Sequence, residues 1–138
     1  MIDLETARTF FSSAPFMVDL GITPTAVSDG RCETEMVLLR RHLQHTGQCH
    51  AGVVTSLADH TAGAAAQTLL SGRAVAITAE LKISLLRPAQ GDKLVCIGVV
   101  IKPGRTLIFA ESEVFAVTGG QRTLVAKLSA TLAVVTPK

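Results

Sequence analysis

Apolar and polar residues change their spacing several times along the chain, and each change marks the boundary of an expected element. The first pattern is helical, because Leu4, Ala7 and Phe11 recur every three or four positions. Acidic residues stand in the first turn, where they complement the positive end of a helix dipole. We therefore expect a short N-terminal helix within residues 1–14.

Strands are predicted where apolar residues alternate with polar ones or form runs that end at turn residues. Residues 22–28 and 32–36 flank Ser28-Asp29-Gly30, an order typical of a β-hairpin. After Gly72, four further β-type runs are separated by turns that contain Pro or Gly: 74–86, 93–101, 106–117 and 123–135. Because the connections are short, we expect these four strands to form an antiparallel meander.

Between the two groups of strands lies the stretch 51–70, whose one formal charge is Asp59. Its composition favours a long helix, and a helix with almost no charged face is expected to be buried in protein. Asp59 and the scattered hydroxyl and amide residues make it a poor membrane span. One long apolar helix under an antiparallel sheet of about six strands describes an α+β hotdog fold, which we expect to form a single domain over 1–138.

Composition narrows the choice of partners. The chain has 138 residues, 48% hydrophobic and 17% charged, so it is expected to bury more surface than an average domain, by association of copies. It has no Trp or Tyr, which excludes a sugar- or base-stacking site built on them. The net charge is only +2 and the basic residues are dispersed along the chain, whereas nucleic-acid binding needs a denser basic stripe.

The cysteines and the chain start bear on the compartment. Cys32, Cys49 and Cys96 are odd in number and lack the spacing of pairs. The start MIDLETARTF carries acids where a signal peptide has basic residues before an apolar run. We therefore expect a reducing cytoplasmic location.

Asp59 is the residue that most needs an explanation. On a helical wheel it shares a face with small or hydroxyl-bearing residues, where another group can approach the helix closely. These residues are Gly52, Thr55, Ser56, Ala62, Gly63 and Ala66. A carboxylate in apolar surroundings is costly unless hydrogen-bonded, and such a group suits general-base work. The structural alternative is that Asp59 caps a neighbouring element or pairs with Lys82 or Arg87.

The start of the same helix supplies a second chemical feature. His50-Ala51-Gly52 opens the helix, so its free backbone N–H groups and dipole form a site for a developing oxyanion. That site lies on the same wheel sector as Asp59, two turns earlier. We therefore expect a base and the oxyanion donors to line the same crevice.

These residues resemble a known family. The segment QHTGQCHAG at 44–52, followed by LAD at 57–59, resembles the HGG…LAD signature of PaaI-type hotdog acyl-CoA thioesterases. LKISLLRPA at 81–89, GD at 91–92 and KPGRT at 102–106 are similar to that family's third strand, turn and basic hairpin. The similarity extends from about residue 15 to the C-terminus.

The resemblance implies a catalytic set: Asp59, Gln44, His50, Ala51, Gly52 and Thr78. Asp59 is implied as general base on water or, alternatively, as nucleophile on the thioester. The Ala51 N–H is implied as oxyanion donor, Gln44 as the amide that positions substrate or water, and Thr78 as the strand hydroxyl. His50 would hold the loop's geometry. The family usually has Gly where this chain has Ala51, and a positive φ there would be costly for Ala.

The resemblance also implies partners. The active site would lie between two subunits of a dimer or a dimer of dimers, with Asp59 of one chain facing Gln44 and His50 of the other. Coenzyme A would enter as part of the substrate, with no metal or other cofactor and no membrane or nucleic-acid partner. The residues implied for binding it are Arg87, Lys102, Arg105 and Gly63. An aryl or medium-chain acyl group is expected.

Rival readings of the same residues stay open. His42, His45, Cys49, His50, Asp59 and His60 include zinc-ligand types, but their spacing lacks a paired metal motif. Cys49 beside His50 is a poor nucleophile–base pair because adjacent residues rarely face one another. A hotdog dehydratase or hydratase is disfavoured because we find no Asp-x4-His pair suited to proton transfer. A non-catalytic hotdog protein that binds acyl-CoA or another apolar ligand is the main alternative, and Asp59→Asn separates it from a hydrolase.

Overall fold

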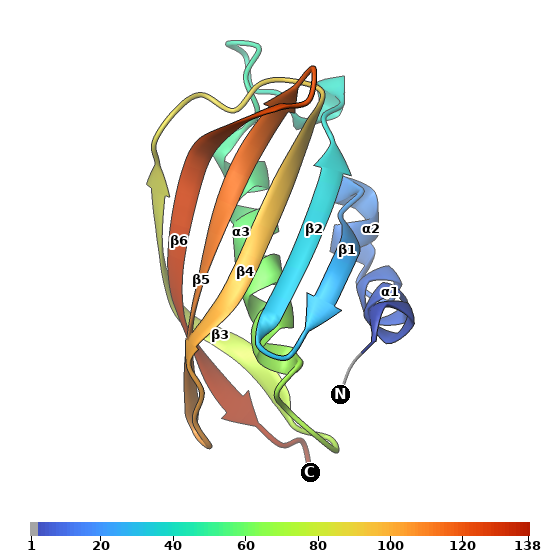
Figure 1. Cartoon of the computed structure of the whole chain (residues 1–138), viewed down its shortest axis with the longest axis vertical. Coiled ribbons are helices and arrows are strands. Elements are labelled where there is room, and N and C mark those ends of the chain that lie inside the picture. Colours follow the sequence, from blue (N-terminus) through green and yellow to red (C-terminus); the bar gives the residue numbers. More distant parts are fainter. Residues whose placement is uncertain (1–2) are drawn as a thin grey trace.

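Six antiparallel strands wrap around one long helix in the computed structural model, which describes residues 3–138 (Figure 1). The helical elements are α1 (Leu4–Ser12), α2 (Pro15–Leu20), the 3-10 turn η1 (Arg40–His42) and α3 (Ala51–Gln67). The strands are β1 (Thr23–Ser28), β2 (Arg31–Val37), β3 (Val75–Leu85), β4 (Lys93–Lys102), β5 (Leu107–Thr118) and β6 (Gln121–Val135). The predicted α+β arrangement is confirmed, with strand ends within about two residues of those expected.

The strand order β1-β2-β4-β5-β6-β3 corrects one expectation. β4, β5 and β6 form the predicted meander, but β3 pairs with β6 at the sheet edge and not with β4. The connection from β3 to β4 crosses the strand ends, since the Leu86 N–H bonds to Val125 of β6 and the Asp92 N–H to Val117 of β5. Turn residues indicate a chain reversal, and they do not indicate which strand becomes the neighbour.

α3 fills the concave side of the sheet. Its buried residues are Val54, Leu57, Ala58, Thr61, Ala62, Ala65 and Ala66. The sequence placed Ala62 and Ala66 on the open face with Asp59, and the structure places both in the core with no exposed surface. The reason is the curvature of the sheet, which wraps around the helix and buries a broad arc of its surface (Figure 1).

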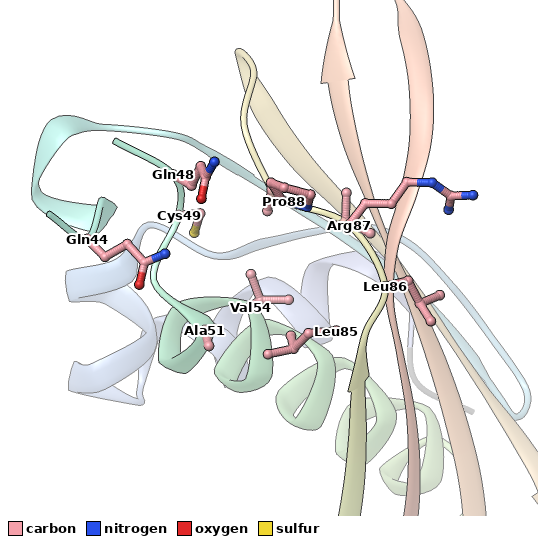
Figure 2. A pocket seen from close by; sticks show the side chains of 11 residues that line it. Gln44, Gln48, Cys49, Ala51, Val54, Leu85, Leu86, Arg87 and Pro88 are labelled. Atoms are coloured by element: carbon pink, nitrogen blue, oxygen red, sulfur yellow. The ribbon is translucent and has the colours of Figure 1, made fainter. Parts of the chain in front are cut away.

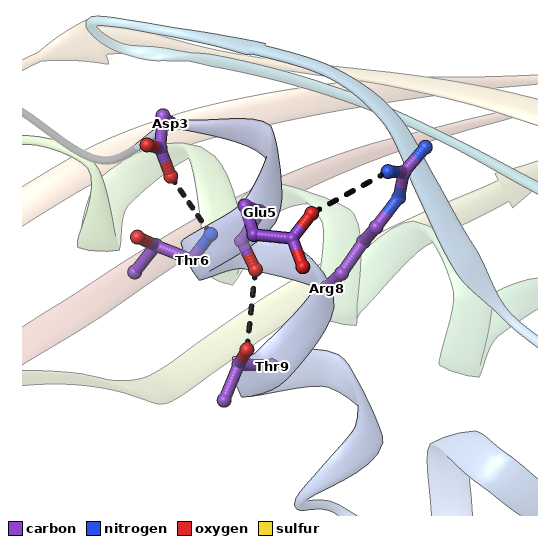
Figure 3. A network of polar contacts seen from close by, with 5 residues as sticks. All are labelled: Asp3, Glu5, Thr6, Arg8 and Thr9. Atoms are coloured by element: carbon purple, nitrogen blue, oxygen red, sulfur yellow. Dashed lines mark hydrogen bonds and ion pairs between the residues drawn. The ribbon is translucent and has the colours of Figure 1, made fainter.

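The N-terminal helix forms as predicted, although residues 1 and 2 of the expected range lie outside the described residues. Asp3 caps α1 by accepting the Thr6 N–H at 2.8 Å, and Glu5 pairs with Arg8 at 3.7 Å (Figure 3). Phe11 points into the core at 3% exposure. The sequence analysis missed α2, a six-residue helix with Pro15 in its first turn.

Candidate active site

The structure brings together two of the implied site residues, Asp59 and Thr78. Thr78 belongs to the inward-facing side of β3, and its Oγ1 donates to Asp59 Oδ1 at 2.8 Å. Asp59 is half-buried on α3, and within residues 3–138 it forms no ion pair. Among the described residues, neither Lys82 nor Arg87 therefore forms the salt bridge to Asp59 that the structural alternative required.

The start of α3 is ordered by His50. His50 is the N-cap, and its Nδ1 accepts the Gly52 N–H at 2.8 Å, which leaves the ring proton on Nε2. The Ala51 N–H has no acceptor within the described part of the chain. Ala51 is the first helical residue, and no residue other than glycine has a positive φ there or elsewhere in that part. The Ala51 methyl group therefore brings no backbone strain.

A pocket opens beside this helix start. It has a volume of about 270 Å³ and is lined by Gln44, Gln48, Cys49, Ala51, Val54, Leu85, Leu86, Arg87, Pro88, Ala89 and Val125 (Figure 2). Gln44 and Ala51 of one chain thus share one cavity. Its walls at Val54 and Leu85 are apolar and suit an apolar group. The sequence analysis did not identify these two wall residues, because they lie on separate elements, α3 and β3.

The loop that carries Gln44 is held by backbone hydrogen bonds. The Gln44 N–H donates to the Gln48 carbonyl at 2.8 Å, and the Cys49 N–H donates to Ala89 at 2.8 Å. The His50 N–H donates to the carbonyl of His42, whose side chain is 2% exposed. These bonds connect the pocket wall to the helix start and give Gln44 a defined place in it.

The structure does not bring all the implied binding residues together. Arg87 lines the pocket, but its side chain points away from Gln44 and donates to the Leu124 carbonyl at 2.8 Å (Figure 2). Lys102 and Arg105 are exposed at the far end of β4, a strand whose ten residues span about 33 Å. Gly63 lies one helical turn beyond Asp59 and is half-buried, and a Cβ there would meet only Leu132, at 3.8 Å.

The two chemical features of α3 are also separated within one chain. Ala51 and Asp59 are eight residues apart, so they lie about 12 Å apart along the helix axis. A single carbonyl group cannot contact both the Ala51 N–H and a water molecule held by the same chain's Asp59. Within one described chain, the Asp59 carboxylate and the Ala51 N–H are therefore too far apart to act on the same carbonyl group.

The other candidate residues have structural surroundings. Cys49 is 5% exposed and burial raises its pKa to about 11, which opposes a role as nucleophile beside His50. The ring of His60 packs against two aromatic rings of α1, with its centroid 4.5 Å from that of Phe11 and 6.2 Å from that of Phe10. Cys32 and Cys96 lie in the strand core as predicted. Across residues 3–138, no three metal-ligand side chains come together and no helix is long and apolar enough to cross a membrane.

Comparisons with known proteins agree with this architecture. Residues 46–123 match the family model of the thioesterase superfamily. A thioesterase family protein from Silicibacter pomeroyi is 34% identical, covers 95% of this chain and 96% of its own, and superposes with a TM-score of 0.92. The PaaI protein of E. coli is 23% identical over 95% of this chain and 91% of its own, with a TM-score of 0.84, a likeness of fold. The hotdog prediction is thereby confirmed.

Two curated relatives are longer than this chain. Candidate esterases of Caenorhabditis elegans and Halobacterium salinarum are 31% and 32% identical to it over 93 and 100 residues. These matches cover 67% and 69% of this chain but 54% and 66% of the relatives. The chain thus spans between half and two thirds of the curated relatives that it matches.

Proposed function

The chain belongs to the thioesterase superfamily, and from this membership we propose that it hydrolyses the thioester of an acyl-CoA with a small aryl or medium-chain acyl group. The observation that carries the proposal is the hydrogen bond of 2.8 Å from Thr78 to the Asp59 carboxylate, beside a helix whose first N–H lacks an acceptor within the described residues. A carbonyl polariser and a fixed base are what thioester hydrolysis requires.

The proposed reaction uses Asp59 as general base. Thr78 occupies Oδ1, so Oδ2 is the oxygen left to accept a proton from water. The water oxygen then bonds to the thioester carbon, the carbonyl oxygen becomes an oxyanion held by the Ala51 N–H, and Gln44 orients the reacting groups. When the C–S bond breaks, the thiolate of coenzyme A takes the proton. Direct attack by Asp59 as nucleophile is the alternative that we keep.

The proposed site needs a second copy of the chain. β3 is an eleven-residue edge strand whose outer edge has no partner within residues 3–138, and Ile77 and Leu85 on it are each 52% exposed. Long apolar edges of this kind are usually covered. Antiparallel pairing of two β3 strands would set the two α3 helices in opposite directions, so that Asp59 of one chain faces the other's helix start. We propose a homodimer, alone or as half of a tetramer.

The ligand is proposed from the pocket and its surroundings. Apolar walls suit the acyl group, and Arg87 at the rim is a candidate for a coenzyme A phosphate. Lys102 and Arg105 lie too far away in the same chain, so they can serve this pocket only from a second copy. Gly63 leaves room for the ligand beside Asp59. The free, buried cysteines fit the reducing cytoplasm that we propose as its location.

A hydrolysis screen tests the proposal. Aryl-, short- and long-chain CoA thioesters are incubated with the wild type, and released thiol is measured. Asp59→Asn should lower kcat by about 100-fold or more, because general-base catalysis contributes that much. Asp19→Asn, on the exposed surface of α2, is the matched control and should behave as the wild type.

Two outcomes would contradict the proposal. Unchanged turnover in Asp59→Asn would remove this carboxylate from the reaction. Acyl-CoA binding without turnover by the wild type would favour the alternative, a non-catalytic ligand-binding protein in which Asp59 is structural.

A further inference from the structure

The middle turn of α3 is attached to the sheet by hydrogen bonds that the proposed reaction does not use. Ser112 of β5 is 1% exposed, and its Oγ donates to the Ala58 carbonyl at 2.8 Å. The hydroxyls of Thr34 on β2 and Thr61 on α3 are 2.7 Å apart, and neither residue has exposed surface. Asp59 lies in the turn between these two attachments.

The threonine bonds have a defined direction. Thr61 Oγ1 also lies 2.8 Å from the Leu57 carbonyl, which can only accept. The Thr61 proton therefore goes to Leu57, and Thr34 must donate to Thr61. The chain of hydrogen bonds runs from β2 to the backbone of the turn that precedes Asp59.

A third strand touches the same turn through a glycine. Gly98 of β4 lies under the helix so closely that a Cβ there would be 2.7 Å from the Thr61 carbonyl oxygen and 2.9 Å from its carbon. On the other side, Thr78 of β3 binds Asp59. Specific contacts from β2, β3, β4 and β5 thus converge on residues 58–61.

Packing alone does not hold this turn in place. Downstream, the core side of α3 is formed by Ala62, Ala65 and Ala66, whose small side chains make shallow ridges. Buried hydroxyl pairs do not stabilise a core more than apolar groups of the same shape, but their directionality favours one arrangement. We therefore expect these bonds to fix the position of the helix, and to add little to the stability of the fold.

We propose that Thr34, Thr61 and Ser112 are positioning residues that hold the Asp59 carboxylate at hydrogen-bond distance from Thr78. The inference rests on the proposed function only in treating Asp59 as the reacting carboxylate. None of the three residues lines the pocket beside Ala51, so they act through the helix backbone.

The test replaces the threonine pair by residues of the same shape. In Thr34→Val/Thr61→Val, kcat should fall about tenfold while KM stays within about twofold, since misplacement of a reacting group affects the chemical step. Ser112→Ala should lower kcat in the same way. Thr34→Ser, made in the wild-type protein with Thr61 intact, keeps the hydroxyl donor and should retain most of the wild-type turnover.

Thr68→Val is the matched control. Thr68 is another buried threonine, at the C-cap of α3 nine residues beyond Asp59, and its hydroxyl accepts the Gly30 N–H at 2.7 Å. This variant should melt at a lower temperature because the Gly30 N–H loses its acceptor, with kcat unchanged. An equal loss of kcat in the control, or wild-type kcat in the double variant, would overturn the proposal.

A crystal structure of the double variant gives an answer that does not depend on activity. The distance between Thr78 Oγ1 and Asp59 Oδ1 should lengthen from 2.8 Å. An unchanged distance overturns the positioning role, whatever the turnover. If the wild type hydrolyses no thioester, the proposed function fails, while this distance still decides whether the three residues position Asp59. Ser112→Ala serves for the same measurement if the double variant does not fold.

Discussion

The backbone N–H groups at the start of α3 differ in what they bind. Gly52 donates to the His50 ring, and Val53 and Val54 donate to the His50 carbonyl. The Ala51 N–H is left without an acceptor in the described chain, and Ala51 lines the same pocket as Gln44. Ala51 therefore provides the oxyanion donor that we propose, because His50 already accepts the hydrogen bonds of the next three N–H groups.

Ala51→Pro tests this donor alone. Proline is accommodated at the first helical position because its missing N–H is not used by the helix. His50 has φ −62° and ψ 137°, a conformation that a following proline allows. The variant should fold normally and lose about 100- to 1,000-fold in kcat, the cost of one oxyanion donor. Circular dichroism checks the fold, and wild-type turnover in the folded variant would contradict the assignment.

His60 makes stability depend on pH. Burial against the rings of Phe10 and Phe11 lowers the pKa of His60 below its ordinary 6.5, and the neighbouring Asp59 only partly opposes this. The unfolded chain therefore binds this proton more readily than the folded one. Stability from this group is present above the unfolded pKa and is lost as the pH falls through the folded pKa.

Thermal melting measured against pH checks this sign. The melting temperature should fall as the pH drops below about 6.5. His60→Phe keeps an aromatic ring beside α1 and removes the titration, so it should flatten part of that slope. The same slope in both proteins would show that another group causes the decrease.

At the scale of the element, the position of α3 depends on how closely the neighbouring strands approach it. Gly98 approaches the Thr61 carbonyl so closely that an added methyl group must push the helix away from β4. Gly63, on the same helix, faces open space apart from Leu132. The two glycines therefore predict opposite effects of the same substitution.

Gly98→Ala should destabilise the protein by about 1–3 kcal/mol, the usual cost of overpacking a core. Gly63→Ala should stabilise it by about 0.5–1 kcal/mol, because alanine favours a helix interior. Urea unfolding of both variants measures the difference. Gly63→Ala should also raise KM if the ligand passes beside this residue, and equal signs in the two stability changes would contradict the packing argument.

At the scale of the whole molecule, the proposed dimer requires that each chain contribute half of two active sites. If Asp59 acts with the other chain's Ala51, inactive variants that lack different halves should complement each other in one dimer. Asp59→Asn and Ala51→Pro chains are unfolded together, mixed in equal amounts and refolded. Half of the dimers are then mixed, each with one intact site and one doubly defective site, so about a quarter of the wild-type activity should return.

The separately refolded variants are the control for this experiment. Activity in the mixture no higher than their average would show that each site is built within a single chain. In that case the β3 edge would not assemble the active site.

The strands were predictable because their signals are local. Turn residues such as Pro103 and Gly104 end one run and precede the next, and β-branched residues fill the interval. α2 was missed because a six-residue helix is too short to show a helical period. The placement of β3 beside β6 was also missed, because the pairing of Val75 with Val135 is far from local.

Some residues of the candidate site could likewise be predicted from the sequence, and others could not. Asp59, His50 and Ala51 could be identified from one helix and its cap, and Gln44 and Thr78 only through the family resemblance. Nothing in the sequence pointed to Ser112, Thr34 or Thr61, since each is a common polar residue in a strand or helix. Their importance comes from partners on other elements.

By itself, the sequence determined the six strands, the first helix and the nearly uncharged helix with its single carboxylate, because spacing, caps and turns act between near neighbours. Only the tertiary structure decided that Thr78 meets Asp59 across nineteen positions and that Ser112 meets Ala58 across fifty-four. Contacts over such separations depend on how a curved sheet closes over a helix. That closure follows from the packing of the whole chain, which no short segment encodes.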